Sequence, residues 1–271
     1  MSRAAVVTIA HGRHDHLAMQ DRSLAAGTRL PDERVLVAID DVELCSWPAF
    51  VMTTPTAEEG LPLAAARNLG VETALDLGCD VVICLDVDCI AGAELVAAYA
   101  EAALRHPDVV WSGPVTYLPP PPSSGYDLER LPALDRPHPA RPAPRPGQVV
   151  FDAAPELFWS LSFACSAQAW RRSGGFCEDY VGYGGEDTDF GRSATRRGLR
   201  LGWLGGARAY HQWHAVSSPP VEHLDSILRN AATYHRRWGA WPMEGWLREF
   251  EQRGLVRHEA DGWRRVEPAP T

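Results

Sequence analysis

Short apolar runs alternate with longer segments of helical spacing through the first 112 residues. Each short run is typical of a buried strand, and each longer segment is typical of a helix that packs against a sheet. The expected strands are residues 4–10, 34–39, 80–85 and 109–112, and the expected helices are residues 17–26, 62–77 and 93–105. This alternation predicts an α/β fold, Rossmann-like, with a mostly parallel sheet and flanking helices.

A proline-rich segment interrupts the alternation. Half of the chain's 22 prolines lie between residues 114 and 146, where we expect neither a helix nor a strand to persist. Regular structure is expected to resume with strands at residues 149–152 and 199–204 and helices at 187–197 and 223–238, followed by a hairpin of residues 255–259 and 263–267. We therefore expect one domain over residues 1–215, with a proline-rich loop at 114–147, and a C-terminal helical extension with a hairpin over residues 216–271.

Charge and composition exclude several classes of protein. The formal net charge of -9 argues against binding to nucleic acid, which requires a basic surface. No apolar run is long enough for an integral membrane segment or a signal peptide, so we expect a cytoplasmic protein. All 26 basic residues are arginine, which excludes a P-loop lysine and a Schiff-base lysine. The six cysteines form no Cys-x-x-Cys pair, so neither a zinc site nor a disulfide framework is expected.

Two aspartates follow the most apolar strand. Asp86 and Asp88 come directly after residues 80–85, at the carboxyl end of the strand, where ligands bind in open α/β sheets. Carboxylates two residues apart at such an end can reach a divalent cation or a ribose. Solvated aspartates at a strand end are the structural alternative, and Asp-x-Asp alone does not decide between the two.

A second acidic motif follows two glycines. Gly184 and Gly185 allow a sharp turn, and Glu186, Asp187 and Asp189 then open a predicted helix. The helix dipole favours a carboxylate in the first turn of a helix. This effect explains one such carboxylate better than it explains three of them within four residues. A carboxylate at such a turn can serve as a general base.

A pair of histidines follows the strand predicted at residues 199–204. His211 and His214 are three residues apart, so their imidazoles can converge on one ion. Together with Asp88 they would form a mixed nitrogen and oxygen site, which suits manganese better than calcium or magnesium.

Together these motifs resemble the GT-A glycosyltransferases, and most closely the galactosyltransferase-type C-terminal module of β-1,4-galactosyltransferases and chondroitin-polymerase-like enzymes. The segments that carry the resemblance are Asp86-Val87-Asp88, Ala66-Arg67-Asn68-Leu69-Gly70, Ser173-Gly174-Gly175-Phe176, Tyr183-Gly184-Gly185-Glu186-Asp187-Thr188-Asp189 and His211-Gln212-Trp213-His214. The resemblance covers roughly residues 4–214, in the family's order and spacing. Tyr183 stands where the family has Trp, and His211 where it has Met, which leaves the sugar and the nucleobase open.

The resemblance implies a role for each matched residue. Asp187 would be the catalytic base, and Glu186 would contact the acceptor or the donor sugar. The metal ligands would be Asp88, His214 and His211. The donor would be bound by Ala10, His11, Arg13, Asp40 (with Asp41 as the alternative), Arg67, Asp86, Asp88, Gly184 and Gly185.

The sequence therefore predicts a metal-dependent glycosyltransferase that moves a sugar from a UDP- or GDP-sugar to a hydroxyl of a carbohydrate or glycoside acceptor. We expect Mn²⁺, with Mg²⁺ as the alternative, and an inverting reaction. A retaining transferase of the same fold and a sugar nucleotidyltransferase are the enzymatic alternatives. A carbohydrate-binding module would explain the ten tryptophans but not the two carboxylate motifs.

Overall fold

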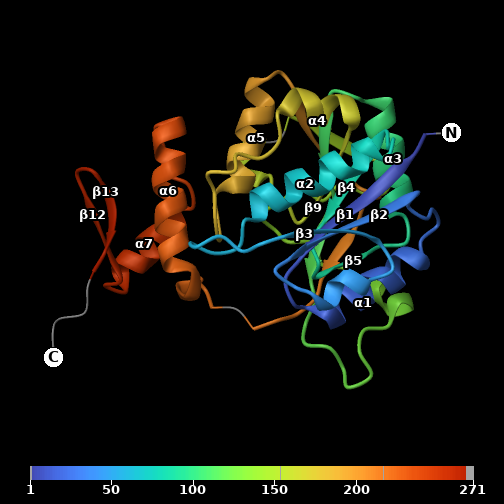
Figure 1. The fold of residues 1–271 in the computed structure, drawn as a ribbon, viewed down its shortest axis with the longest axis horizontal. Helices are drawn as coiled ribbons and strands as arrows, with labels where there is room; N and C mark the ends of the chain where they lie inside the picture. The colour runs from blue at the N-terminus through green and yellow to red at the C-terminus, as the bar shows by residue number, and fades with distance from the viewer. Residues whose placement is uncertain (1, 153, 216, 267–271) are drawn as a thin grey trace.

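An eight-stranded sheet forms the centre of the protein (Figure 1), which a computed structural model describes for residues 2–152, 154–215 and 217–266. Its strand order is β3-β2-β1-β4-β9-β6-β10-β8. The strands are β1 (Ala4–Ala10), β2 (Glu33–Ile39), β3 (Phe50–Thr54), β4 (Val81–Leu85), β6 (Val109–Ser112), β8 (Val149–Phe151), β9 (Ser162–Ser166) and β10 (Arg200–Leu204). Strand β9 is antiparallel to β4 and β6, and β8 is antiparallel to β10, whereas the other pairs are parallel. The prediction of a mostly parallel α/β sheet is confirmed.

Helices cover both faces of the sheet (Figure 1). On one face α2 (Leu63–Asp76), α4 (Ala167–Ser173) and α5 (Glu186–Arg196) pack against alternate residues of β1, β4 and β9. On the other face α1 (His14–Ala25) and α3 (Leu95–Arg105) cover the remaining set. Every residue of β1 and β4 is buried, as a parallel strand covered on both faces requires.

A second, three-stranded sheet corrects the expectation for the proline-rich segment. Strand β11 (Ala209–His211) pairs with β5 (Cys89–Ala91) on one side and with β7 (Val115–Tyr117) on the other. Strand β7 and a 3-10 helix at Leu128–Leu134 both lie within residues 114–147, so this segment is not free of regular structure. Strand β7 lies before the proline cluster, and each of these strands has only three residues, which is too short for a periodic signal.

The C-terminal extension is formed by α6 (Leu224–Trp238), α7 (Glu244–Gln252) and the hairpin of β12 (Val256–Glu259) and β13 (Gly262–Arg265), which lie to one side of the sheet in Figure 1. These elements share an apolar cluster of their own. The extension is tied to the sheet domain through Asp189 of α5, which accepts hydrogen bonds from Arg237 (2.6 Å) and from Trp238 Nε1 (2.6 Å). The predicted hairpin is therefore present, although its expected last residue, 267, lies outside the described residues.

The expected helices and strands agree with the observed bounds to within a few residues. Strands β3, β5, β7, β9 and β11 and helices α4 and α7 were not predicted. Within the described residues no helix is both long and apolar enough to cross a membrane.

Candidate active site

The two motif aspartates lie at the carboxyl edge of the central sheet. Asp86 directly follows β4, and its backbone N–H donates to the carbonyl of Leu161 at 2.9 Å. The fully buried Gln20 of α1 stabilises the turn that follows, because its side-chain amide donates to the carbonyls of Asp86 (2.7 Å) and Cys89 (3.1 Å). This turn holds both aspartates at the end of the strand, where the sequence predicted them.

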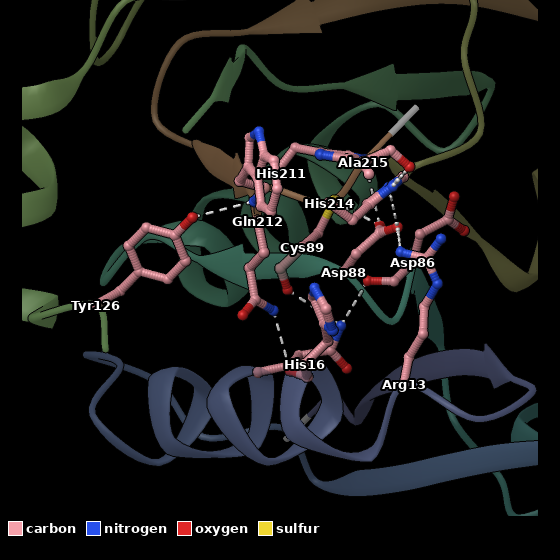
Figure 2. Close-up of polar contacts among 12 residues, drawn as sticks. Arg13, His16, Asp86, Asp88, Cys89, Tyr126, His211, Gln212, His214 and Ala215 are labelled. Atoms are coloured by element: carbon pink, nitrogen blue, oxygen red, sulfur yellow. Dashed lines mark hydrogen bonds and ion pairs between the residues drawn. The ribbon is translucent and has the colours of Figure 1, made fainter. Parts of the chain in front are cut away.

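The small sheet brings the two histidines to Asp88. In its register His211 is opposite Cys89, and the N–H of Gln212 donates to the carbonyl of Asp88 at 2.7 Å. His211 Nε2 lies 3.6 Å and His214 Nε2 3.4 Å from the Asp88 carboxylate (Figure 2). One ligand atom from each of these three residues lies within 4.8 Å of the other two. The pairing of β5 with β11 therefore brings together the three residues predicted to bind the metal, with Asp88 just before β5, His211 at the end of β11 and His214 three residues further on.

The donor set of this cluster fits a divalent cation. Burial would raise the pKa of Asp88, but the hydrogen bond with His214 and the charges of His211 and Arg13 lower it to about 2, so the carboxylate is ionised. Burial lowers the pKa of His211, which favours the neutral imidazole that a metal requires. One carboxylate and two imidazoles are a ligand set compatible with Mn²⁺. Arg13 Nη1 lies 3.0 Å from Asp88 and supplies a further positive charge beside the cluster.

Arg67 connects the two acidic motifs. It is 5% exposed, and its guanidinium lies 3.2 Å from both Asp86 and Glu186. Burial alone would lower the pKa of Arg67, but the two carboxylates outweigh this and raise it. Arg67 therefore holds Asp86 and Glu186 at a fixed separation and neutralises part of their charge.

The turn before α5 has a backbone conformation that favours glycine. Gly184 and Gly185 have φ values of 96° and 92°, a region that other residues rarely adopt. A Cβ on Gly184 would also lie 2.8 Å from the sulfur of Met243, in the C-terminal extension. The turn thus requires glycine both for its conformation and for the close packing of the extension against it.

Asp187 stands in the first turn of α5, beside Glu186. Asp187 is partly buried, and this partial removal from water raises its pKa to about 7, with the neighbouring charge of Glu186 acting in the same direction. A carboxyl group that titrates near neutrality can accept a proton and later release it. Asp187 therefore has the property that a general base requires.

A pocket at the ends of β1, β2 and β4 borders the cluster of Asp88, His211 and His214. It is lined by Ile9, Ala10, His11, Arg13, Ile39, Leu61, Leu63, Arg67, Asp86, Val87 and Asp88. Six of the predicted donor-binding residues line it, whereas Asp40, Gly184 and Gly185 do not. Asp40 is exposed nearby and accepts a hydrogen bond from Thr56 (3.3 Å), while Asp41 accepts bonds from Gly12 N and His14 at 2.8 and 2.9 Å. Asp41 thus stabilises the loop after β1, and Asp40 has the freer carboxylate.

Several residues that shape this site carried no sequence signal. Gln20 and Gln212 act through backbone contacts, Gln212 by donating to the carbonyl of His16 at 3.0 Å (Figure 2). Tyr126, from the proline-rich segment, accepts from the N–H of Trp213 at 3.1 Å. Contacts between residues so distant along the chain become visible only in the fold.

Comparisons with known proteins identify the class of fold. No family model matches the sequence, and no curated protein sequence matches it. Among solved structures the chain is similar to GalNAc-T7 crystallised with UDP, GalNAc and Mn²⁺, with a TM-score of 0.57 and 14% identity over 93% of this chain and 57% of that one. It is also similar to S. aureus TarS, with a TM-score of 0.54 and 14% identity over 84% of this chain and 64% of that one. The chain has the GT-A fold, and it spans less than two thirds of either of these solved chains.

Proposed function

We propose that this protein is a glycosyltransferase that moves a sugar from a nucleotide-sugar donor to an acceptor hydroxyl and depends on a divalent metal. The observation that carries the proposal is the Asp88, His211 and His214 cluster at the carboxyl edge of a GT-A sheet, directly beside a pocket. UDP, GalNAc and Mn²⁺ in the GalNAc-T7 crystal support a donor of the same chemical class here. The donor is a UDP- or GDP-sugar, Mn²⁺ is preferred over Mg²⁺, and a cytoplasmic location stays a prediction.

The residues of the site have distinct roles in this proposal. Asp88, His211 and His214 would hold the metal, whose charge would neutralise the departing diphosphate. Ala10, His11 and Arg13 line the pocket for the nucleotide. Asp40 is proposed to contact the nucleobase. Arg67 orients both carboxylates, because its Nη2 contacts the two oxygens of Asp86 at 3.2 and 3.5 Å and its Nη1 contacts Oε1 of Glu186 at 3.2 Å. In this proposal Asp86 contacts the ribose and Glu186 contacts the acceptor or the donor sugar.

Asp187 is the proposed base of an inverting reaction. Its carboxylate removes the proton from the acceptor hydroxyl as the oxygen attacks the anomeric carbon, and the bond from that carbon to the diphosphate breaks. The galactosyltransferase-like motif around Gly184 and Gly185 supports this assignment, as does the pKa of Asp187 near 7. In the retaining alternative Asp187 orients the substrates, and the anomeric configuration of the product distinguishes the two reactions.

Nucleotide binding tests the proposal without knowledge of the acceptor. UDP and GDP are titrated calorimetrically into wild type, Asp88→Asn and His214→Ala, with Mn²⁺ and with chelator. We expect one nucleotide to bind only with metal and both variants to lose on the order of tenfold or more in affinity, because each removes a direct ligand. His258→Ala, on the exposed face of the hairpin, is the matched control and should bind as wild type does. Metal-independent binding, or no loss in the two variants, would exclude this site.

A further inference from the structure

Arg141, in the proline-rich segment, is a buried cation that has no hydrogen bond or ion pair to its guanidinium among the described residues. Arg141 is 6% exposed, and none of its three guanidinium nitrogens has a hydrogen-bond partner within the described residues. Arg67, the other arginine buried to this degree in the described ranges, is paired with two carboxylates. Leaving a buried guanidinium unpaired is unfavourable and rare, so Arg141 calls for a ligand.

Two tryptophans enclose the guanidinium. Its carbon lies 4.4 Å from the ring centre of Trp203, which is 1% exposed, and 4.9 Å from that of Trp159, which is only partly buried. Trp203 therefore contacts the guanidinium from the protein interior, and Trp159 contacts it from the side nearer to solvent. Trp203 lies near the carboxyl end of β10, and Trp159 lies two residues before Leu161, whose carbonyl accepts from the N–H of Asp86. Arg141 thus lies at the same edge of the sheet as the candidate active site.

A row of aromatic rings connects Arg141 with the metal-binding cluster. His211 stacks on Tyr117 with ring centres 4.5 Å apart, Tyr117 contacts His138 at 5.6 Å, and His138 contacts Trp159 at 5.0 Å. Tyr117 is 48% exposed, so the row is open to solvent beside the cluster. Exposed aromatic rings of this kind can receive the apolar faces of sugars, with the buried cation at the far end.

The positive charge of Arg141 acts on Asp187, the proposed catalytic base. Burial lowers its pKa to about 10, which still leaves it protonated near neutrality, and the charge of Asp187 is among those that oppose the shift. By contrast, Arg13 and Asp88 line the nucleotide pocket, whereas Arg141 is not part of its lining. A ligand for Arg141 would therefore reach the site from the acceptor side.

We propose that Arg141 binds an oxyanion of the acceptor, a carboxylate, sulfate or phosphate, and that Tyr117, His138 and Trp159 form the surface on which its sugar rings lie. This inference rests on the transferase function proposed above and makes the acceptor an acidic carbohydrate. The anion reaches the guanidinium when the partly exposed ring of Trp159 turns aside. A guanidinium offers a planar pair of donors that matches such an oxyanion.

Anion titrations in the presence of Mn²⁺ and UDP, which occupy the donor side, test the assignment. The probes are inorganic sulfate and the pair methyl β-glucuronide and methyl β-glucoside, which differ in a carboxylate. The readout is calorimetry with tryptophan fluorescence, since Trp159 and Trp203 contact the guanidinium. The proteins are wild type, Arg141→Met, Arg141→Lys and the control Arg192→Met, an arginine that lies over Tyr234 and Trp238 but is paired with Glu156.

We expect wild type and Arg192→Met to bind sulfate and to prefer the glucuronide, and Arg141→Met to lose on the order of tenfold or more in affinity for both anions. Arg141→Lys should fall between, and the affinity for Mn²⁺ and UDP should stay within about twofold in all four proteins. A lack of anion binding by wild type would overturn the proposal even if Arg141→Met does not fold. Equal binding by a folded Arg141→Met would overturn it too, and a loss of UDP affinity in that variant would assign Arg141 to the donor diphosphate instead. Failure of wild type to bind any nucleotide with metal would reject the transferase function, a result that is separate from the sulfate titration.

Discussion

Asp187 is the residue whose chemistry the proposed reaction depends on most. Replacing it with asparagine keeps the shape of the side chain and removes the ability to accept a proton. Asp187→Asn should bind Mn²⁺ and nucleotide as wild type does, and lose on the order of 10²–10⁴-fold in turnover. Turnover is measured as nucleotide release from the donor with acceptor present, and normal turnover in a folded, nucleotide-binding variant would show that the base lies elsewhere.

The raised pKa of Asp187 also predicts a pH dependence. Because the base must be ionised, kcat/KM should rise about tenfold per pH unit below about 7 and level off above it. Asp187→Asn should lack this dependence in its residual activity. A wild-type profile that is flat between pH 5.5 and 8 would contradict the assignment.

The raised pKa of Asp187 also predicts how the free energy of unfolding changes with pH. The pKa of Asp187 is higher in the folded state than its usual value of 3.8, so the folded state binds more protons and loses stability as pH rises from about 4 to about 7. Asp187→Asn removes this loss. At pH 8 it should raise the free energy of unfolding relative to wild type by on the order of 1 kcal/mol, a value reduced for the partial exposure of the side chain, and at pH 4 it should have little effect. Denaturant titrations at the two pH values measure the difference.

At the scale of elements, the contact between α5 and α6 determines how the glycine turn before the proposed base is held. Asp189 is 1% exposed and accepts bonds from Tyr180 as well as from Arg237 and Trp238. Asp189→Asn would leave these donors poorly paired and the Arg237 charge uncompensated. We expect it to lower the free energy of unfolding by about 2–4 kcal/mol.

The control for this variant is Asp225→Asn, which removes an exposed ion pair with Arg265 in the same extension. Surface pairs contribute little, so this change should cost less than about 1 kcal/mol. Equal losses in the two variants, measured by urea denaturation, would contradict a special role for the buried junction.

The elements also show what the sequence can and cannot predict. Strand β4 is a continuous apolar run and β1 and β6 are mostly apolar, and the position of the aspartates after β4 follows from a general rule of α/β sheets. Strand β9 was not among the expected strands, and its direction carries no sequence signal, because an apolar run has the same pattern in a parallel and an antiparallel strand. The helical spacing of His211 and His214 suggested their convergence, but the chain there is a strand end, and pairing with β5 brings the two imidazoles to Asp88.

At the scale of the whole molecule, the site is assembled from segments that are far apart in sequence. The pocket comes from residues 9–88, the imidazoles from the end of β11 and the residues just after it, and the proposed base from α5. Arg141 lies among prolines and arginines and had no distinguishing mark in the sequence. Its lack of a hydrogen-bond partner among the described residues is a property of the folded chain, so it could be recognised only from the structure.

The most direct test of the account is nucleotide release from a panel of UDP- and GDP-sugars by the metal-stripped protein, measured before and after metal is added back. The Asp88, His211 and His214 cluster predicts no release above background in chelator, and recovery that is greater with Mn²⁺ than with Mg²⁺. Asp88→Asn should recover little at any metal concentration. Full turnover of a nucleotide sugar in excess chelator would contradict the account.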